Sequence, residues 1–175
     1  MRLSFQTDYA LRTLMLLAAK DSHQSIATIA SAYGISKNHL MKVAQRLVAG
    51  GFIESVRGRG GGLKLARPAV TLNVGAVVRI MEDTGTFVEC FNPAINNCVV
   101  TPVCSLRHAL AGALEAFAQH LDEFTIDDLV PDPERYRQHL DSMSGKFATM
   151  ITDPMPRGSR PPLATLFLPS GKDTQ

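Results

Sequence analysis

Residues 34–51 read GISKNHLMKVAQRLVAGG, and this stretch decides the fold of the N-terminal part of the chain. Its apolar residues follow the i, i+3, i+4, i+7, i+8 spacing of one buried helix face. They are Leu40, Val43, Ala44, Leu47 and Val48. Ser36 is placed to cap the start of the helix, and the glycine pair at 50–51 is placed to end it. The spacing therefore predicts a helix that packs one side on a core.

The opposite face of this helix is rich in hydrogen-bond donors and has no acidic residue. It carries Lys37, Asn38, His39, Met41, Lys42, Gln45 and Arg46. Before it, Ser25 can cap a short helix over 26–32, and Gly34 permits a tight turn between the two helices. This arrangement is typical of a helix-turn-helix, whose second helix places its first residues against base edges. We therefore predict DNA contacts from Ser36, Lys37, Asn38, His39 and Lys42.

A glycine-rich hairpin follows this helix directly. Residues 52–56 and 63–66 read as two short strands around the tip RGRGGG at 57–62. Arg57 and Arg59 are suited to a narrow A/T-rich minor groove, where the negative potential is enhanced. The tip lacks the Gly-Lys-Ser/Thr ending of a phosphate-binding loop and does not open a helix. The hairpin therefore has the features of a wing.

Two further helices complete the expected domain. Thr7 can cap a helix over 8–19, and Asn73 can cap a helix that ends near 84–85. Their apolar stripes contain Ala10, Leu11, Leu14, Leu17 and Ala18 in the first helix, and Val74, Val77, Val78 and Met81 in the second. The sequence thus predicts a winged helix-turn-helix domain over 1–84, mainly helical with one small β-hairpin.

Charge is distributed unevenly along the 175 residues. Residues 1–70 hold ten Lys or Arg against three acids, a net charge of +7, whereas residues 71–130 hold two bases against eight acids. The basic segment favours a polyanionic partner, because each neutralised phosphate releases counterions. Charge alone leaves open a basic face that only contacts water. No apolar run is long enough to span a bilayer and the N-terminus lacks an export signal, so we expect a cytoplasmic protein without a membrane partner.

All three cysteines lie in one expected loop, residues 85–104. The spacing Cys90-x7-Cys98-x5-Cys104 lacks the C-x2-C pair of a structural zinc site, and three cysteines are too few for a disulfide scaffold. Three thiolates in a loop suit an iron–sulfur cluster, which normally needs a fourth protein ligand. The candidates for that ligand are Asp8, Glu89, Asn92, His108 or a small molecule. A metal-free set of redox-sensing thiols is the alternative.

A long helix is expected after the loop, from Ser105 to about Asp122. Its apolar residues recur at steps near 3.5, which is typical of a helix that pairs with its own copy. They are Leu106, Leu110, Ala113, Phe117 and Leu121, with Phe124 beyond. The alternative is that this stripe covers the domain's own core. We assign 105–130 to a dimerisation helix with a short following helix, and 131–175, where prolines recur, to a disordered tail in which only 136–150 has helical potential.

Several ordered motifs carry a family resemblance from Met1 to about Val130. They are TDYALR at 7–12, GISKNHL at 34–40, VRGRGGG at 56–62, VEC at 88–90, TPVC at 101–104 and FTIDDL at 124–129. On these motifs the chain resembles the NsrR family of nitric-oxide-sensing winged-helix repressors, relatives of the iron–sulfur regulator IscR. The seven residues between Cys90 and Cys98 and the segment after residue 130 depart from the family pattern.

The resemblance implies a homodimeric repressor that binds a palindromic, A/T-rich operator in double-stranded DNA. It implies a 2Fe–2S or 4Fe–4S cluster held by Cys90, Cys98 and Cys104, with Asp8 of the partner subunit as fourth ligand. Nitric oxide is then the signal that releases the operator.

Two alternatives remain beside this reading. IscR-type relatives use a histidine three residues after the last cysteine, where this chain has Arg107, with His108 one step later. This favours the nitric-oxide sensor over an IscR-like sensor of cluster status. An enzyme would need a nucleophile and a base within reach of each other, and we find no such arrangement in the sequence.

Overall fold

The computed structural model describes residues 3–58, 60–83, 85 and 87–150, with the backbone alone for 144–150. Its helices are α1 (Phe5–Lys20), α2 (Ile26–Tyr33), α3 (Lys37–Ala49), α4 (Val74–Met81), α5 (Ser105–Asp122) and α6 (Pro133–Met150). The strands β1 (Ile53–Val56) and β2 (Gly62–Leu65) pair antiparallel, and short 3₁₀ turns occur at η1 (Ala69–Thr71), η3 (Glu89–Phe91) and η4 (Thr101–Val103). The expected mainly helical fold with one small hairpin is confirmed.

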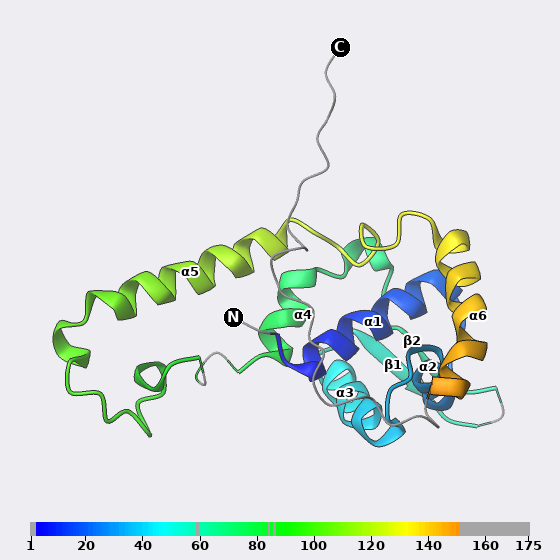
Figure 1. Cartoon of the computed structure of the whole chain (residues 1–175). Helices are drawn as coiled ribbons and strands as arrows, with labels where there is room; N and C mark the ends of the chain where they lie inside the picture. The colour runs from blue at the N-terminus through cyan, green and yellow to red at the C-terminus, as the bar shows by residue number, and fades with distance from the viewer. Residues whose placement is uncertain (1–2, 59, 84, 86, 151–175) are drawn as a thin grey trace, which may run out of the picture.

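Helix α1 lies at the centre of the body of the molecule. It contacts α3, α4, α6 and β2, and Figure 1 shows it running between these helices. Ala10, Leu14 and Leu16 on α1 are completely buried. Burying a large apolar side chain stabilises a fold by about 1.5–3 kcal/mol, so this helix supplies much of the core.

The helix boundaries follow the local capping signals, with several corrections. Helix α4 ends at Met81 rather than near residues 84–85, Ser36 makes no side-chain capping bond to α3, and the short helix expected after α5 is a turn over 126–129. Ser25 caps α2, Gly34 ends it in the left-handed conformation, and Asn73 caps α4, as predicted. Helix α1, however, begins at Phe5, because the Ser4 hydroxyl rather than Thr7 caps it. Helix α5 has Cys104 at its N-cap position, with no side-chain capping bond from Ser105 or any other residue described there.

The hairpin is held by a third piece of backbone. Gln24, in the connection between α1 and α2, exchanges two backbone hydrogen bonds of 2.9 Å with Leu63 on β2. Gly62 lies directly beside this bridge with a φ of +155°, and a Cβ atom there would be 2.7 Å from the Gln24 carbonyl oxygen. Glycine is therefore required where the wing joins the body.

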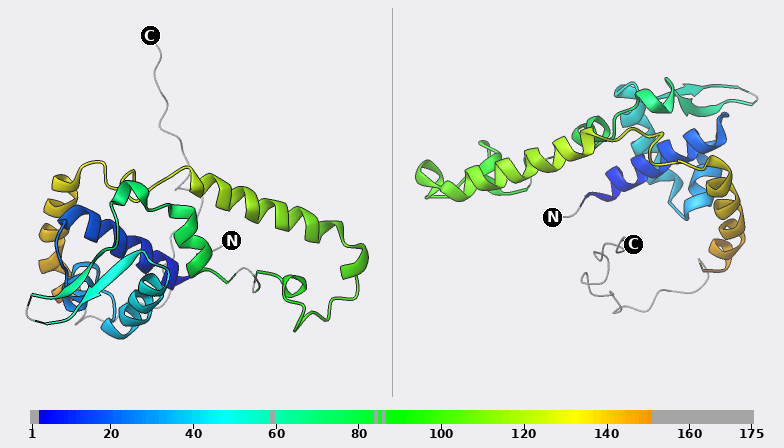
Figure 2. Two further views of the ribbon diagram at one scale, coloured as in Figure 1. Left: turned by 180° about the vertical axis from the view of Figure 1, so that it is seen from behind. Right: turned by 90° about the horizontal axis from the view of Figure 1, so that it is seen from above.

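Helix α5 is an arm that projects from this body. Figures 1 and 2 show it extending away from the other helices, with the cysteine loop at its far end. It contacts α4, yet none of its residues is buried. Among the described residues, no helix is long and apolar enough to cross a membrane.

Residues 133–150 form helix α6, which confirms the helical potential predicted over 136–150 but contradicts the assignment of this part of the chain to a disordered tail. Asp132 caps this helix by accepting from the Arg135 amide at 2.9 Å, and Pro133 occupies its first turn, where a proline needs no amide hydrogen. The helix packs on α1 and α2 and buries Leu140. Residues 151–175 of the expected tail lie outside the described residues.

A half-buried pair of tyrosines joins α6 to the helix-turn-helix. The hydroxyls of Tyr136 on α6 and Tyr33 on α2 are 2.8 Å apart, and Tyr33 donates to the Arg12 carbonyl of α1 at 2.8 Å. Burial and the hydrogen bond to Tyr136 raise the pKa of Tyr33 well above its usual range, so it remains a donor. The three helices are thus tied at one point.

Replacing Gly62 by alanine should push the wing strand away from Gln24. We expect Gly62→Ala to lower the free energy of unfolding by about 1–3 kcal/mol, because the new methyl group overlaps backbone that cannot move independently. Gly112→Ala on the exposed surface of α5, where a Cβ meets no atom within 4 Å, is the control. The control should be neutral or stabilise by about 0.5–1 kcal/mol. Urea unfolding of both variants measures this, and equal stabilities would contradict the close approach.

Candidate functional site

The recognition helix α3 is fixed by its apolar face and presents its polar face to solvent. Leu40, Val43 and Leu47 are completely buried. The predicted DNA contacts are all exposed, namely Ser36, Lys37, Asn38, His39 and Lys42. No acidic residue lies in the first turn of α3, and the helix dipole adds positive potential there. This end of α3 can therefore contact phosphates and base edges.

The arginines of the basic segment differ in whether they contact other residues of the chain or are exposed. Arg57 at the wing is exposed, and Arg59 lies outside the described residues. Arg46 of α3, which the sequence placed on the donor-rich face, donates instead to the Gln6 side chain at 2.9 Å and to the Ile80 carbonyl of α4. Arg46 is thus occupied by contacts within the body.

The cysteine loop is held by its own side chains. Cys90 lies in η3, Cys98 precedes η4, and Cys104 is the N-cap residue of α5; all three are free thiols and partly buried. The Asn96 side-chain oxygen accepts from the Cys98 amide at 3.1 Å and from the Thr101 hydroxyl at 3.2 Å. These bonds shape the turn that carries Cys98 toward α5.

Arg107 closes the loop onto α5. Its Nε donates to the Cys90 carbonyl at 3.3 Å, so the first and last cysteines lie on segments that this arginine joins. A shallow cleft of about 310 Å³ lies beside it, lined by Gly85, Phe91, Arg107, His108 and Ala111. His108, one of the candidate fourth ligands, therefore faces the loop from α5.

The donor chemistry of this loop fits an iron–sulfur cluster, since three thiols are the ligands such clusters prefer. Within the described part of one chain, however, no group of three His, Cys, Asp or Glu side chains converges as a metal site. The other candidate ligands have partners: Asp8 pairs with Arg12 at 2.9 Å, Glu89 accepts from the Asn97 amide at 3.3 Å, and Asn92 accepts from the Ala94 amide. One chain alone does not assemble the ligand set.

Glu82 joins the loop to the first turn of α1, and the sequence analysis missed it. Its Oε1 accepts from the Ser4 amide at 2.7 Å and from the buried Thr7 hydroxyl. Glu82 ends α4, just before the cysteine loop, and Thr7 adjoins Asp8. No local pattern could have revealed this contact, because it spans 75 residues of sequence.

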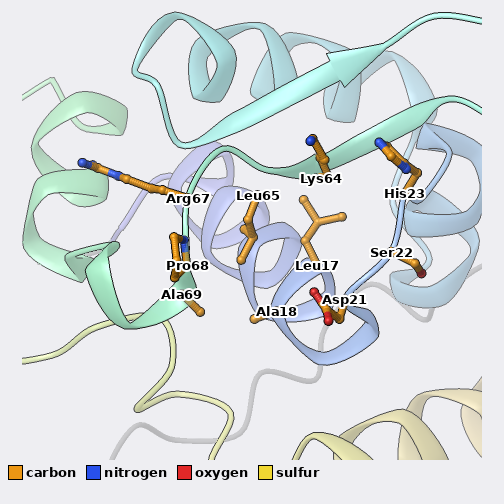
Figure 3. A pocket seen from close by; sticks show the side chains of 10 residues that line it. All are labelled: Leu17, Ala18, Asp21, Ser22, His23, Lys64, Leu65, Arg67, Pro68 and Ala69. Carbon is orange, nitrogen blue, oxygen red and sulfur yellow. The ribbon is translucent and has the colours of Figure 1, made fainter.

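A second cleft lies at the other end of α1 and holds none of the predicted site residues. Figure 3 shows its lining, which comes from the end of α1, the following connection, β2 and η1. Asp21, His23, Lys64 and Arg67 surround the apolar side chains of Leu17 and Leu65 there. Lys64 pairs with Glu54 across the hairpin at 3.1 Å, so its charge is already matched.

The chain was compared with known proteins. Residues 3–132 match the Rrf2 family, described as iron-dependent transcriptional regulators. The HTH-type transcriptional regulator NsrR of Bacillus licheniformis is 43% identical over 142 residues, covering 80% of this chain and 99% of the relative. The NsrR of Bacillus subtilis is 48% identical over 136 residues, covering 77% and 93%.

Among solved structures, T. potens IscR superposes with a TM-score of 0.60 at 22% identity, covering 78% of this chain and 90% of that chain. This likeness supports the winged-helix fold alone. The resemblance to NsrR regulators is confirmed by the sequence relatives. The match over residues 3–132, together with these identities, shows that the chain belongs to the Rrf2 family of iron-dependent transcriptional regulators.

Proposed function

We propose that the chain is a homodimeric repressor that holds an iron–sulfur cluster, binds operator DNA with the cluster in place and releases the DNA when nitric oxide reaches the iron. One observation carries the proposal: three free, partly buried thiols lie in the loop that leads directly into α5, the helix that buries none of its residues. The NsrR relatives support the same function.

Exposed apolar side chains support the dimer. Val99 is 92% exposed, Val103 is 83% exposed and Leu106 is 64% exposed, all at the junction of the loop with α5. Covering such surface stabilises an assembly by about 25 cal/mol per Å². Helix α5 has 18 residues, about 27 Å, and its seam repeats near 3.5 residues, so a second copy is the partner that fits it.

A two-fold dimer of this kind suits a palindromic operator. The two α3 helices enter successive major grooves when their half-sites lie about 10 base pairs apart. Ser36, Asn38 and His39 then face base edges, while Lys37 and Lys42 contact phosphates. Arg57 and Arg59 of the wing enter the adjacent A/T-rich minor groove.

Cys90, Cys98 and Cys104 would hold the cluster, 2Fe–2S or 4Fe–4S, together with Asp8 of the partner subunit. When bound, the cluster supplies an iron atom that takes nitric oxide. A carboxylate is a weak ligand for such iron and is easily displaced. Asp8 must also leave its ion pair with Arg12, or share it, in order to ligate.

The positions of these residues couple ligation to DNA binding. Cys104 is the N-cap residue of α5, so its release changes how the arm starts. Asp8 lies in the first turn of α1, which Glu82 joins to the end of α4 and hence to the loop. The start of α5 and the first turn of α1 therefore both respond to the same ligand set. Such a shared response couples cluster ligation to DNA binding.

A metal-free thiol switch is the second candidate, favoured by the free, partly buried state of all three cysteines. It requires two thiols to form a disulfide on oxidation and needs no iron. The two candidates differ in colour, because protein purified without air absorbs visible light when it holds a cluster and is colourless when it does not.

DNA binding by α3 should depend on its lysines through phosphate contacts. Lys42→Ala should weaken binding to every duplex and lower the slope of log affinity against log salt by about 0.9, because one phosphate contact is lost. Lys20→Ala, which breaks an ion pair with Asp141 at the far end of α1, is the matched control and should leave the slope unchanged. Fluorescence anisotropy over a salt series measures both. An unchanged slope for Lys42→Ala would remove this residue from the interface.

Nitric oxide should act through Asp8. We expect Asp8→Ala to keep the three thiolate ligands but to change the cluster absorption spectrum and the amount of nitric oxide needed for DNA release. Arg12→Gln removes the same ion pair and leaves the carboxylate, so it should respond like the parent. Anaerobic absorption spectra during stepwise nitric oxide addition, paired with gel shifts on promoter DNA, measure this. A parent protein that is colourless and holds DNA regardless of nitric oxide would refute the proposal.

A further inference from the structure

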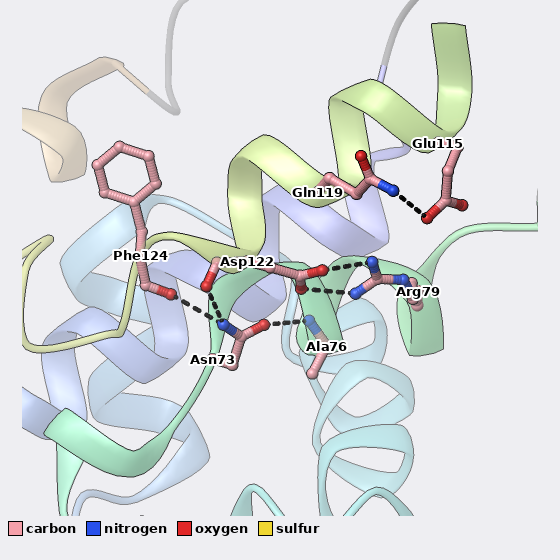
Figure 4. Close-up of polar contacts among 7 residues, drawn as sticks. All are labelled: Asn73, Ala76, Arg79, Glu115, Gln119, Asp122 and Phe124. Atoms are coloured by element: carbon pink, nitrogen blue, oxygen red, sulfur yellow. Dashed lines mark hydrogen bonds and ion pairs between the residues drawn. The ribbon is translucent and has the colours of Figure 1, made fainter. Parts of the chain in front are cut away.

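The base of the arm, at the C-terminal end of α5, is clamped to α4 by one arginine. Arg79 donates to both oxygens of Asp122, with Nη1 to Oδ1 at 2.6 Å and Nη2 to Oδ2 at 2.5 Å, as Figure 4 shows. A two-bond contact between a planar guanidinium and a carboxylate fixes direction as well as distance. The hydrogen-bonded guanidinium also holds the pKa of Asp122 below its usual range.

Backbone contacts make this joint tight. The Asn73 side chain donates to the Asp122 carbonyl at 2.7 Å (Figure 4). The Val74 amide donates to the Phe124 carbonyl at 2.9 Å. At Gly75 a Cβ atom would lie 2.2 Å from Asp122 Oδ1 and 2.9 Å from the Ala118 carbonyl oxygen. The two helices therefore approach so closely that only glycine fits between them.

A second arginine continues the connection from α4 to the recognition helix. Arg46 of α3 donates to the carbonyl of Ile80, the residue next to Arg79, and to the side chain of Gln6 on α1. Helices α3 and α4 are also in contact. The Arg79–Asp122 pair thus fixes the direction of α5 relative to α4. The bond from Arg46 to the Ile80 carbonyl in turn fixes α4 relative to α3.

The Arg79–Asp122 ion pair contributes too little to the stability of the fold for stability alone to be its role. The side chains of Arg79 and Asp122 are 43% and 38% exposed, and exposed ion pairs contribute little net stability. Their effect on direction is larger, because α5 is a lever about 27 Å long. A rotation of about 10° at the joint moves the other end of this lever by about 5 Å, more than the spacing of about 3.4 Å between base pairs.

We infer that Arg79, Asp122 and Arg46 are positioning residues that fix the dimer arm relative to the recognition helix and so set the separation of the two recognition helices on DNA. This inference rests on the proposed dimeric repressor. It assigns to Arg46 a role within the protein in place of a contact with the groove.

The test compares two duplexes: one that the parent protein selects from a random-sequence library, and the same duplex with one half-site scrambled. For Asp122→Asn we expect the preference for the intact duplex over the scrambled one to fall by about tenfold or more, because misaligned helices cannot both reach their half-sites. Binding to the scrambled duplex and the cluster absorption spectrum should not change. Arg46→Lys should act in the same direction.

Two further variants show whether the loss of preference comes from misplaced recognition helices or from the loss of an exposed ion pair in general. The charge exchange Arg79→Asp with Asp122→Arg rebuilds an ion pair at the joint and should recover part of the preference. Asp141→Asn breaks the exposed Lys20–Asp141 pair on the other side of the body, and it should behave like the parent.

The outcomes distinguish the possible failures. An unchanged preference in Asp122→Asn overturns the inference alone, and so does a parallel loss of binding to both duplexes, which would indicate a damaged α3. A parent protein that binds the intact and scrambled duplexes equally well overturns the proposed dimeric repressor and this inference together.

Discussion

Burial of α1 is the interaction on which the rest of the structure depends. Its apolar face forms the core against α3, α4 and β2, and α6 closes it from the outer side. The same helix carries Asp8 in its first turn, next to Thr7 and its bond to Glu82. In the proposed sensor, a change in ligation at Asp8 therefore acts directly on the helix that holds the DNA-binding body together, without a separate signalling element.

The second constraint is that α5 buries no residue within its own chain. Exposing the apolar seam of such a helix to water costs free energy, so the arm and the adjoining loop need a partner surface that covers it. The loop also contains thiols without a complete ligand set in one chain. In the proposed homodimer a second copy of the chain satisfies both requirements, so the proposal links dimer formation, cluster binding and operator symmetry in one assembly.

Local signals in the sequence were sufficient for much of the fold. The caps at Ser25 and Asn73, the left-handed Gly34 and the periodic face of α3 predicted elements that the structure contains, since each depends on residues within a few positions. The start of α1 was wrong because Ser4 offers the same capping chemistry as Thr7. Helix α6 was predicted only in part, as helical potential over 136–150 within a disordered tail; its start was not, because Pro133 lies in the first turn, where proline is favourable.

The candidate site was less accessible to sequence reasoning. The exposed residues at the start of α3 follow from its periodicity, but the contacts of Glu82, Arg46 and Arg79 join segments between 34 and 78 residues apart. Such contacts produce no periodic pattern in the sequence. The central claim of the proposal is that the ligand set is completed by a second chain.

This claim is tested most directly with mixed dimers that pair one Asp8→Ala subunit with one Cys104→Ser subunit, purified through two different tags. If Asp8 ligates across the interface, each mixed dimer retains one complete site and one cluster with the parent spectrum and response to nitric oxide; if Asp8 ligates within its own chain, no complete site remains and the account is contradicted.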